Sequence, residues 1–208
     1  MSEPASPPVP SVYRLRVVLR GISPLIWRRL LVRSDTTLAD LHTVLQVAFA
    51  WDGSHLHRFK VQGREYEGLY EYGQVRLADL GLRVGERFVY DYDFADLWRH
   101  DLRVEGIVAV EAAGTYPRCA GGRRAGPPED SGGPSEFMGR TRPHQRWEVA
   151  RRVAEIIEEI IDNPASGDDY YEELACLRPW LETERFDRKA LNRSLARSYG
   201  RFEGGFGT

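Results

Sequence analysis

The sequence predicts an α+β fold: a mixed or antiparallel β-sheet with a helix packed across it, resembling a β-grasp-like roll, followed by a C-terminal helical extension. Three observations support this prediction. Apolar and polar residues alternate in several stretches of the first half, as they do on strands with one buried face. One segment among them has apolar residues at helical spacing, and the last third is helical in pattern. Strands followed by a run of helices are typical of the α+β class.

The chain length and composition allow one hydrophobic core. The chain has 208 residues, of which 42% are hydrophobic, and no internal repeat is present. We therefore expect a disordered Pro/Ser-rich leader at 1–11, an α+β domain at 12–165, and a helical extension of that domain at 166–208. A formal charge of -2 argues against a general polyanion binder.

Two separated cysteines do not make a disulfide framework, which favours a reducing, cytoplasmic location. We find no apolar run long enough to cross a bilayer and no signal peptide, so we expect no membrane association.

The first two predicted strands carry an unusual concentration of arginine. Residues 13–20 and 26–33 alternate in polarity, and the stretch 13–33 contains six arginines and no acid. We expect these arginines to cover a solvent-exposed sheet face. The alternative is a basic face that binds phosphate groups.

A helix is predicted to begin after Thr37, which can cap it together with Asp40. A third strand follows at residues 57–61. His55 and His57 form an H-x-H pair beside this strand, a spacing that metal sites use, so both are candidate metal ligands. Two histidines alone leave such a site short of ligands.

A hairpin at 88–105 and a loop at 116–134 are predicted to form a polar groove. The hairpin alternates an aromatic face with a carboxylate face, and its turn brings Asp93, Asp96 and His100 close together. Glycines and prolines predict an irregular loop. Its candidate ligand-binding residues are Arg124, Glu129 and Asp130. Because a guanidinium can hold a carboxylate and carbonyl groups together, we expect Arg124 to pair with Asp93, Asp96 or Asp130.

These two stretches also carry a family resemblance. YDFADLWRH, followed by C-x-G-G-x-R-A-x-P-P-E-D-x-G-G from Cys119, resembles the plasmid pRiA4b ORF-3-like family, as do the motifs at 24–29, 37–42 and 49–59. The resemblance spans 12–195 and implies an association with mobile elements, but no established biochemical activity. Ala95 replaces an expected glycine. Ser131 replaces a frequent second cysteine, which argues against a thiol-pair or metal role for Cys119.

The C-terminal third predicts three helices. The first has an apolar stripe over 149–161, the second is short and covers about 168–177, and the third begins after Asp187 and ends near Tyr199. We expect the last eight residues to be frayed.

Three functions remain open. The first is a binding module whose groove accepts a ligand or protein partner. The second is a metal-assisted hydrolase in which the groove carboxylates and His55 or His57 hold a divalent metal. The third is DNA binding or an accessory role in recombination through the arginine-rich face. In a purely structural alternative, the groove residues would lock the loop onto the sheet.

Overall fold

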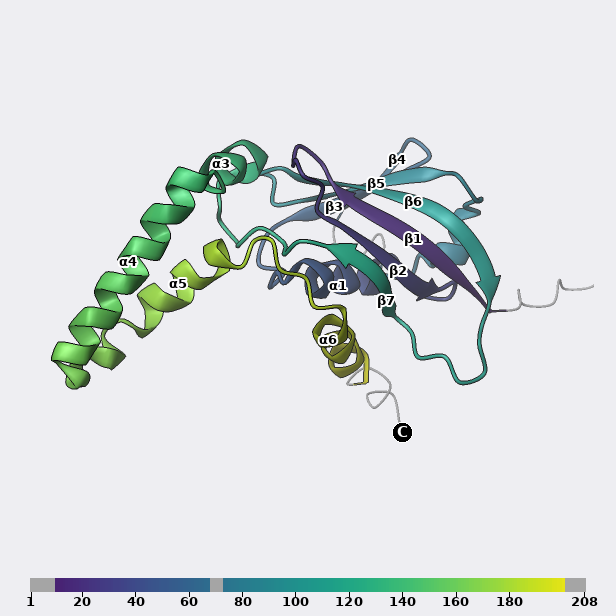
Figure 1. Cartoon of the computed structure of the whole chain (residues 1–208). Helices are drawn as coiled ribbons and strands as arrows, with labels where there is room; N and C mark the ends of the chain where they lie inside the picture. The colour runs from purple at the N-terminus through teal and green to yellow at the C-terminus, as the bar shows by residue number, and fades with distance from the viewer. Residues whose placement is uncertain (1–9, 68–72, 201–208) are drawn as a thin grey trace, which may run out of the picture.

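Seven strands form one sheet in the order β4-β3-β5-β6-β1-β2-β7, and every pair of neighbours is antiparallel. Figure 1 shows this computed structural model, which describes residues 10–67 and 73–200. The predicted frayed end and nearly all of the predicted leader lie outside the described residues. The strands are β1 Ser11–Leu19, β2 Trp27–Arg33, β3 His57–Val61, β4 Arg64–Glu67, β5 Arg87–Tyr92, β6 Trp98–Ala109 and β7 Arg118–Arg123.

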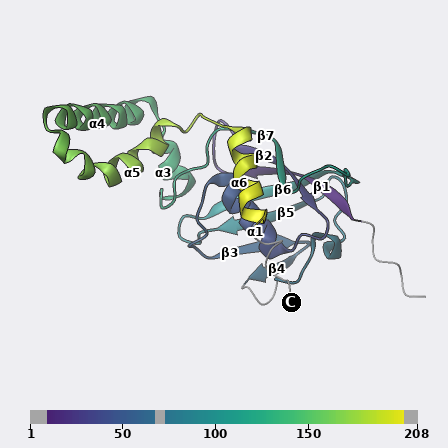
Figure 2. The same cartoon turned by 90° about the horizontal axis from the view of Figure 1, so that it is seen from below.

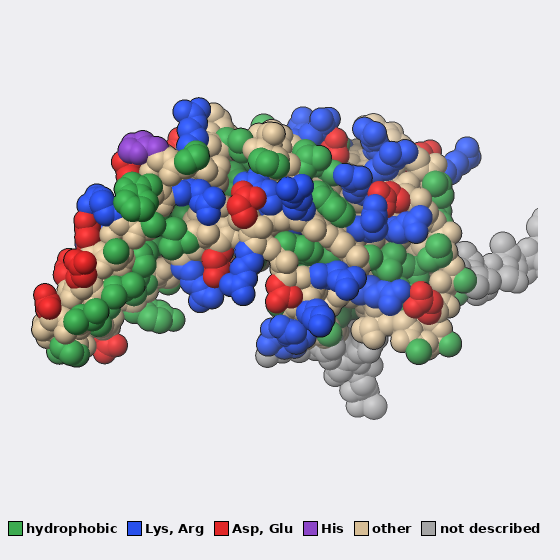
Figure 3. Space-filling view, in the orientation of Figure 1, with side chains coloured by type: hydrophobic (Ala, Val, Ile, Leu, Met, Phe, Trp, Pro, Cys, Tyr) green, Lys and Arg blue, Asp and Glu red, His purple; other side chains and the backbone are tan. Residues whose placement is uncertain are grey.

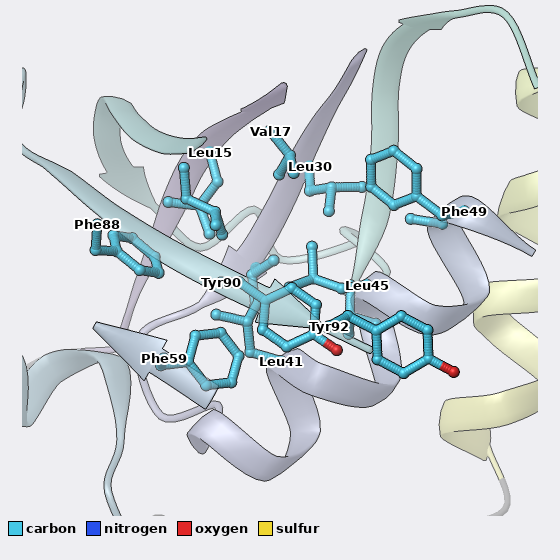
Figure 4. Packing of buried hydrophobic residues seen from close by; sticks show 14 of the residues in the cluster. Leu15, Val17, Leu30, Leu41, Leu45, Phe49, Phe59, Phe88, Tyr90 and Tyr92 are labelled. Atoms are coloured by element: carbon cyan, nitrogen blue, oxygen red, sulfur yellow. The ribbon is translucent and has the colours of Figure 1, made fainter. Parts of the chain in front are cut away.

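The helix α1, Leu38–Phe49, packs across one face of this sheet (Figure 2). Thr37 and Asp40 form the expected capping box: the Thr37 side chain accepts from the Asp40 amide, and the Asp40 carboxylate accepts from the Thr37 amide. The buried side of α1 meets aromatic and aliphatic side chains of β1, β2, β3 and β5 (Figure 4). A short 3-10 helix, η1 Leu77–Leu80, follows the β3–β4 hairpin.

The α+β prediction is confirmed, and the alternation of the strands explains it. On β1, Leu15 and Val17 are fully buried against α1, whereas Arg14 lies exposed on the outer face. Of the six arginines expected on an exposed face, Arg14 and Arg20 are exposed, Arg16, Arg29 and Arg33 are half-buried, and Arg28 is only 2% exposed. Successive side chains on β2 point to opposite faces of the sheet, so one of the neighbours Arg28 and Arg29 must point inward, and that residue is Arg28.

The expectation of an irregular loop at 116–134 was wrong for its first part. Residues 118–123 form the edge strand β7, paired with β2. Glycine is required at position 122, because a Cβ atom there would lie 2.5 Å from the Phe186 ring and 2.9 Å from the Trp27 carbonyl oxygen. A Cβ atom at Gly121 would make only an ordinary contact, 3.5 Å from the Trp27 ring. In the sequence, a strand glycine that lets an aromatic ring approach the backbone cannot be told from a glycine in a loop, which is why the loop prediction failed here.

The remaining helices form two groups. Helix α6 returns to the body, where it contacts β7 and α1, and Asp187 caps it by accepting from the Ala190 amide as expected. Helices α4 and α5 pair with each other and project from the body with α3 at their base (Figure 1). The bounds are α3 Gly133–Arg140, α4 Pro143–Asp162, η2 Pro164–Asp168, α5 Tyr171–Leu181 and α6 Arg188–Gly200. Within the described ranges, no helix combines the length and apolar content needed to span a membrane.

Candidate functional site

The turn between β5 and β6 holds Asp93 in a fixed orientation. Asp93 has a left-handed backbone (φ 55°), and its Oδ1 atom accepts from the amides of Ala95 and Asp96. Aspartate tolerates this conformation because its short side chain can bond the following amides. The carboxylate is buried, and its second oxygen, Oδ2, points toward His55. The Oδ1 atom therefore stabilises the turn, while the Oδ2 atom remains available to bind a ligand.

The second part of the 116–134 loop is fastened over this turn. Asp96 Oδ2 accepts from the Gly132 amide at 2.8 Å, and the Trp51 indole donates to the Pro127 carbonyl at 2.8 Å. Gly133 follows with φ 77°, and a Cβ atom there would lie 2.4 Å from the Asp96 carbonyl oxygen. Glycine at position 133 thus lets the loop backbone touch the hairpin turn.

Three predicted residues converge where the loop crosses the turn. His55 Nε2 lies 3.1 Å from Asp130 Oδ1 and 3.9 Å from Asp93 Oδ2. One potential ligand atom of each of the three residues lies within 4.8 Å of the others. Asp130 also has a left-handed backbone (φ 51°), and its carboxylate is exposed. Imidazole and carboxylate groups at this spacing are able to hold a divalent ion.

Glu129 has a structural position beside this cluster. Its Oε1 atom accepts from the Asp52 amide at 2.9 Å and from the Tyr92 hydroxyl at 3.0 Å. Its Oε2 atom is buried and has no hydrogen-bond partner within the part of the chain that the structure describes. Burial raises the pKa of Glu129 above its usual value. This carboxylate therefore joins the loop to Asp52, in the segment after α1, and to Tyr92 of β5.

His57 and His100 lie elsewhere. His57 stacks on His42, with ring centroids 3.6 Å apart, on the face of the sheet that α1 covers. His100 is fully buried between Phe49 and Trp51, and burial lowers its pKa to about 4. The expectation that His100 joins Asp93, Asp96 and Asp130 was wrong, because its side chain projects into the core layer.

The expected pairing of Arg124 was also wrong. Arg124 is 2% exposed, and its guanidinium donates to the Pro24 carbonyl at 2.6 Å and pairs with Glu184 at 2.8 Å. It therefore fastens the chain after β7 to the β1–β2 turn and to the segment before α6. Arg124 anchors the loop, but through Pro24 and Glu184 rather than through the hairpin carboxylates.

Cys119 is buried in β7, where its thiol donates to the Gly121 carbonyl, and burial raises its thiol pKa. The Asn192 side chain of α6 accepts from the Cys119 amide and donates to its carbonyl. These contacts are those of a packing residue and are unfavourable for a nucleophile, because the thiolate is the reactive form.

Sequence reasoning overlooked Trp51 and Tyr92, which support the cluster. Tyr92 stacks on Trp51 with centroids 5.0 Å apart and contacts His55 edge-on at 5.8 Å. Both side chains have the pattern of core aromatics, so only their polar tips, the indole NH and the phenol OH, mark them as parts of the site.

A comparison with known families finds a match that covers both the hairpin and the loop. The model of the plasmid pRiA4b ORF-3-like protein family matches residues 11–194. The chain belongs to this family. The matched range includes all the motifs on which the resemblance rested, namely residues 24–29, 37–42, 49–59, 92–100 and 119–133.

Two relatives of the pRiA4b ORF-3-like chain extend the comparison. The uncharacterized protein y4hQ of Sinorhizobium fredii is 35% identical over 144 residues, which cover 61% of this chain and 69% of that protein. A crystal structure of MM3350, a protein of unknown function from Methanosarcina mazei Go1, superposes with a TM-score of 0.63 at 29% identity. The match covers 88% of this chain and 98% of MM3350. The match to MM3350 supports the fold, and the description of neither relative names an activity.

Proposed function

We propose that this chain is a binding module that holds a divalent cation in the groove between the 88–105 hairpin and the 116–134 loop. One observation carries the proposal: the convergence of His55, Asp93 and Asp130. Ligand atoms lie roughly 2.0–2.2 Å from a bound transition metal, so neighbouring ligands are about 3–3.5 Å apart. The separation of 3.1 Å between His55 and Asp130 already fits, and that of 3.9 Å between His55 and Asp93 requires only a small shift.

The chemistry of the three groups narrows the choice of ion. Calcium and magnesium prefer oxygen ligands only, whereas an imidazole suits zinc or iron, and carboxylates suit manganese. One imidazole and two carboxylates therefore favour manganese, iron or zinc. Because the protein supplies three ligands, further positions would remain for water or for an acidic group of a partner.

The position of Glu129 favours binding over hydrolysis. A metal-assisted hydrolase needs a proton acceptor that reaches the attacking water. The free oxygen of Glu129 is buried, and its other oxygen is occupied by Asp52 and Tyr92. This carboxylate is thus placed to hold the loop rather than to accept a proton from a substrate.

The test is metal binding by the protein purified without a metal-affinity tag. Elemental analysis should find manganese, iron or zinc in the wild-type protein, or calorimetric titration should detect binding of one of them. His55→Gln should weaken that binding at least about 100-fold, because loss of an outer-shell partner alone typically costs roughly 10- to 100-fold. His144→Gln is the matched control, since His144 also contacts a carboxylate, Glu148 at 3.3 Å, but on the exposed surface of α4. Absence of binding by the wild-type protein, or equal binding by both variants, would refute the proposal.

A second candidate function is nucleic-acid binding by the outer sheet face, and a cluster of arginines favours it. Arg16, Arg87 and Arg103 line a hollow of about 330 Å³ on β1, β5 and β6. No salt bridge involves these three among residues 10–67 and 73–200, whereas Arg20 in the same hollow pairs with Asp101. Figure 3 shows Lys and Arg side chains over the sheet, interspersed with acidic ones.

If this face binds nucleic acid, the affinity for a labelled 20-nucleotide strand should decrease steeply with salt, because bound counterions are released. The double variant Arg16→Ala/Arg103→Ala should bind more weakly. It should also have a smaller slope of log affinity against log salt concentration, by the contribution of about two phosphate contacts. Arg83→Ala removes an exposed arginine outside the hollow and is the control. Salt-independent binding, or an unchanged slope in the double variant, would exclude this function.

A further inference from the structure

Helix α4 carries two apolar stripes, and only one of them has a partner among the residues that the structure describes. The first stripe contains Ile156, which is fully buried, and Val153, which is half-buried. It lies toward α5, to which Arg152 of α4 is joined by a salt bridge with Glu173 at 2.8 Å. This stripe accounts for the packing of the projecting α4–α5 pair.

The second stripe faces outward. Trp147 is 68% exposed, Ile157 49% and Ile161 70%. Hydrophobic side chains run along the surface of the projecting arm (Figure 3). A helix that meets water on one side normally carries polar residues there. The complete stripe, which we call the outer seam, is Trp147, Ala150, Ala154, Ile157 and Ile161.

The spacing of the outer seam is that of a helix pair. Its residues follow one another at intervals of three, four, three and four, which is the a/d pattern of a coiled coil. It extends over four turns of a 20-residue helix, about 30 Å long. Exposed apolar residues that have no partner are usually scattered singly over a surface. Regular a/d spacing along one side of a helix is instead typical of a helix that packs against another helix.

The ends of the seam match each other about its centre. Ala154 is seven residues from both Trp147 and Ile161, so an antiparallel copy centred there would place Trp147 against Ile161 of the partner subunit at each end. Ala154 would meet Ala154 of the partner subunit at the axis, and the small Ala150 would lie beside the larger Ile157 of the partner subunit. The seam is therefore complementary to itself, as a two-fold interface must be.

The charges along α4 select the same orientation. The first half carries Arg146, Arg151 and Arg152 with one acid, Glu148, and the second half carries the acids Glu155, Glu158, Glu159 and Asp162. Arg151 and Glu158 border the seam on the same flank, seven residues apart. In an antiparallel pair, Arg151 would face Glu158 of the partner subunit, whereas a parallel pair would set like charges side by side. Arg151 contacts Glu155 within the helix, but this exposed pair is weak and easily exchanged.

We propose that the outer seam of α4 binds α4 of a second copy of this chain in antiparallel orientation. The two α4–α5 arms then form a four-helix bundle that joins two sheet bodies. This proposal concerns α4 alone and is independent of the cation site and of the arginine hollow.

Sedimentation velocity of the full chain at micromolar concentrations tests the proposal. The wild-type protein should be a dimer, and Ile157→Lys/Ile161→Lys should be a monomer with unchanged helical circular dichroism. Val84→Lys is the matched control, because Val84 is a similarly exposed apolar residue (61%) on the body, and this variant should remain dimeric. A monomeric wild-type protein would overturn the proposal and indicate a different protein as the occupant of the seam. A dimer that persists in the double lysine variant would overturn it as well.

A charge exchange tests the orientation. Arg151→Glu and Glu158→Arg should each weaken the dimer, and the combined variant should restore it, because each exchanged residue again faces an opposite charge across the antiparallel pair. Failure of the combined variant to recover, with both single variants folded, would contradict the antiparallel arrangement.

Discussion

Lowering the pH from 7 to 5 is expected to reduce the free energy of unfolding by roughly 4 kcal/mol, with His42 and His100 contributing about 2 kcal/mol each. Burial lowers the pKa of His100 to about 4. Burial and the neighbouring His57 lower the pKa of His42 to about 3. In the unfolded chain both histidines titrate near 6.5.

The sign follows from these pKa values. Below pH 6.5 the unfolded chain takes up protons that the folded protein does not accept, so stability falls with pH until the folded-state values near 4 and 3 are reached. His57, whose pKa is also lowered by burial, acts in the same direction. Asp91 does not contribute in this window, because the neighbouring Arg99 and Arg58 hold its pKa below its usual value despite burial.

Urea unfolding followed by tryptophan fluorescence at pH 7, 6 and 5 measures the effect. His100→Gln should remove about half of the pH dependence, because glutamine can still donate to the carbonyls of Tyr90 or Trp98 that His100 contacts but cannot be protonated. His144→Gln, at an exposed site on α4, should leave the dependence unchanged. An unfolding midpoint that stays constant between pH 7 and 5 would show that the buried histidines do not titrate as described.

Arg28→Met is expected to destabilise the fold by about 3 kcal/mol, because it leaves buried carbonyl groups without donors. The Arg28 guanidinium donates to the carbonyls of Ala48, Trp27 and Arg123, which joins the end of α1 to β2 and β7. Burial lowers the pKa of Arg28 to about 10. Removing this costly buried charge offsets part of the loss.

The adjacent residue provides the control. Arg29 lies on the outer face of the same strand and pairs with Glu105 at 2.5 Å, with its side chain 36% exposed. Arg29→Met should cost less than about 1 kcal/mol, as is usual for exposed ion pairs. Thermal unfolding of both variants compares them directly. Equal destabilisation by the two substitutions would show that the inward carbonyl contacts of Arg28 do not decide its effect.

Arg28 and Arg29 also show which features of the fold the sequence predicts and which it does not. Alternation on each strand predicts that one face meets α1 and the other meets solvent, and this is correct because successive side chains on a strand point to opposite faces. Two adjacent arginines must therefore divide between the faces. The inward one is stable only because three carbonyl groups from separate segments are placed around it, which no local pattern reveals.

In the candidate site, too, the sequence predicted some features and the tertiary structure decided others. From the sequence, the hairpin turn and the loop could be recognised as polar and near each other, and Asp93, Asp130 and His55 were among the named residues. The residues that actually meet were decided by the path of the loop. It is fastened by Asp96 and Trp51 on the hairpin side. Arg124, expected on that side, instead holds Pro24 and Glu184.

By itself, the sequence determined the properties that depend on local geometry. These are the α+β class, the capped start of α1 at Thr37, the hairpin strands β5 and β6, and the arginine-rich outer face. The tertiary structure alone decided which distant side chains converge. It directed His55 to the two aspartates and His57 to His42, although the two histidines are only two residues apart. The physical reason is that periodicity fixes the face on which a side chain lies, whereas contacts between distant segments depend on loop anchors and on glycine positions where backbones touch.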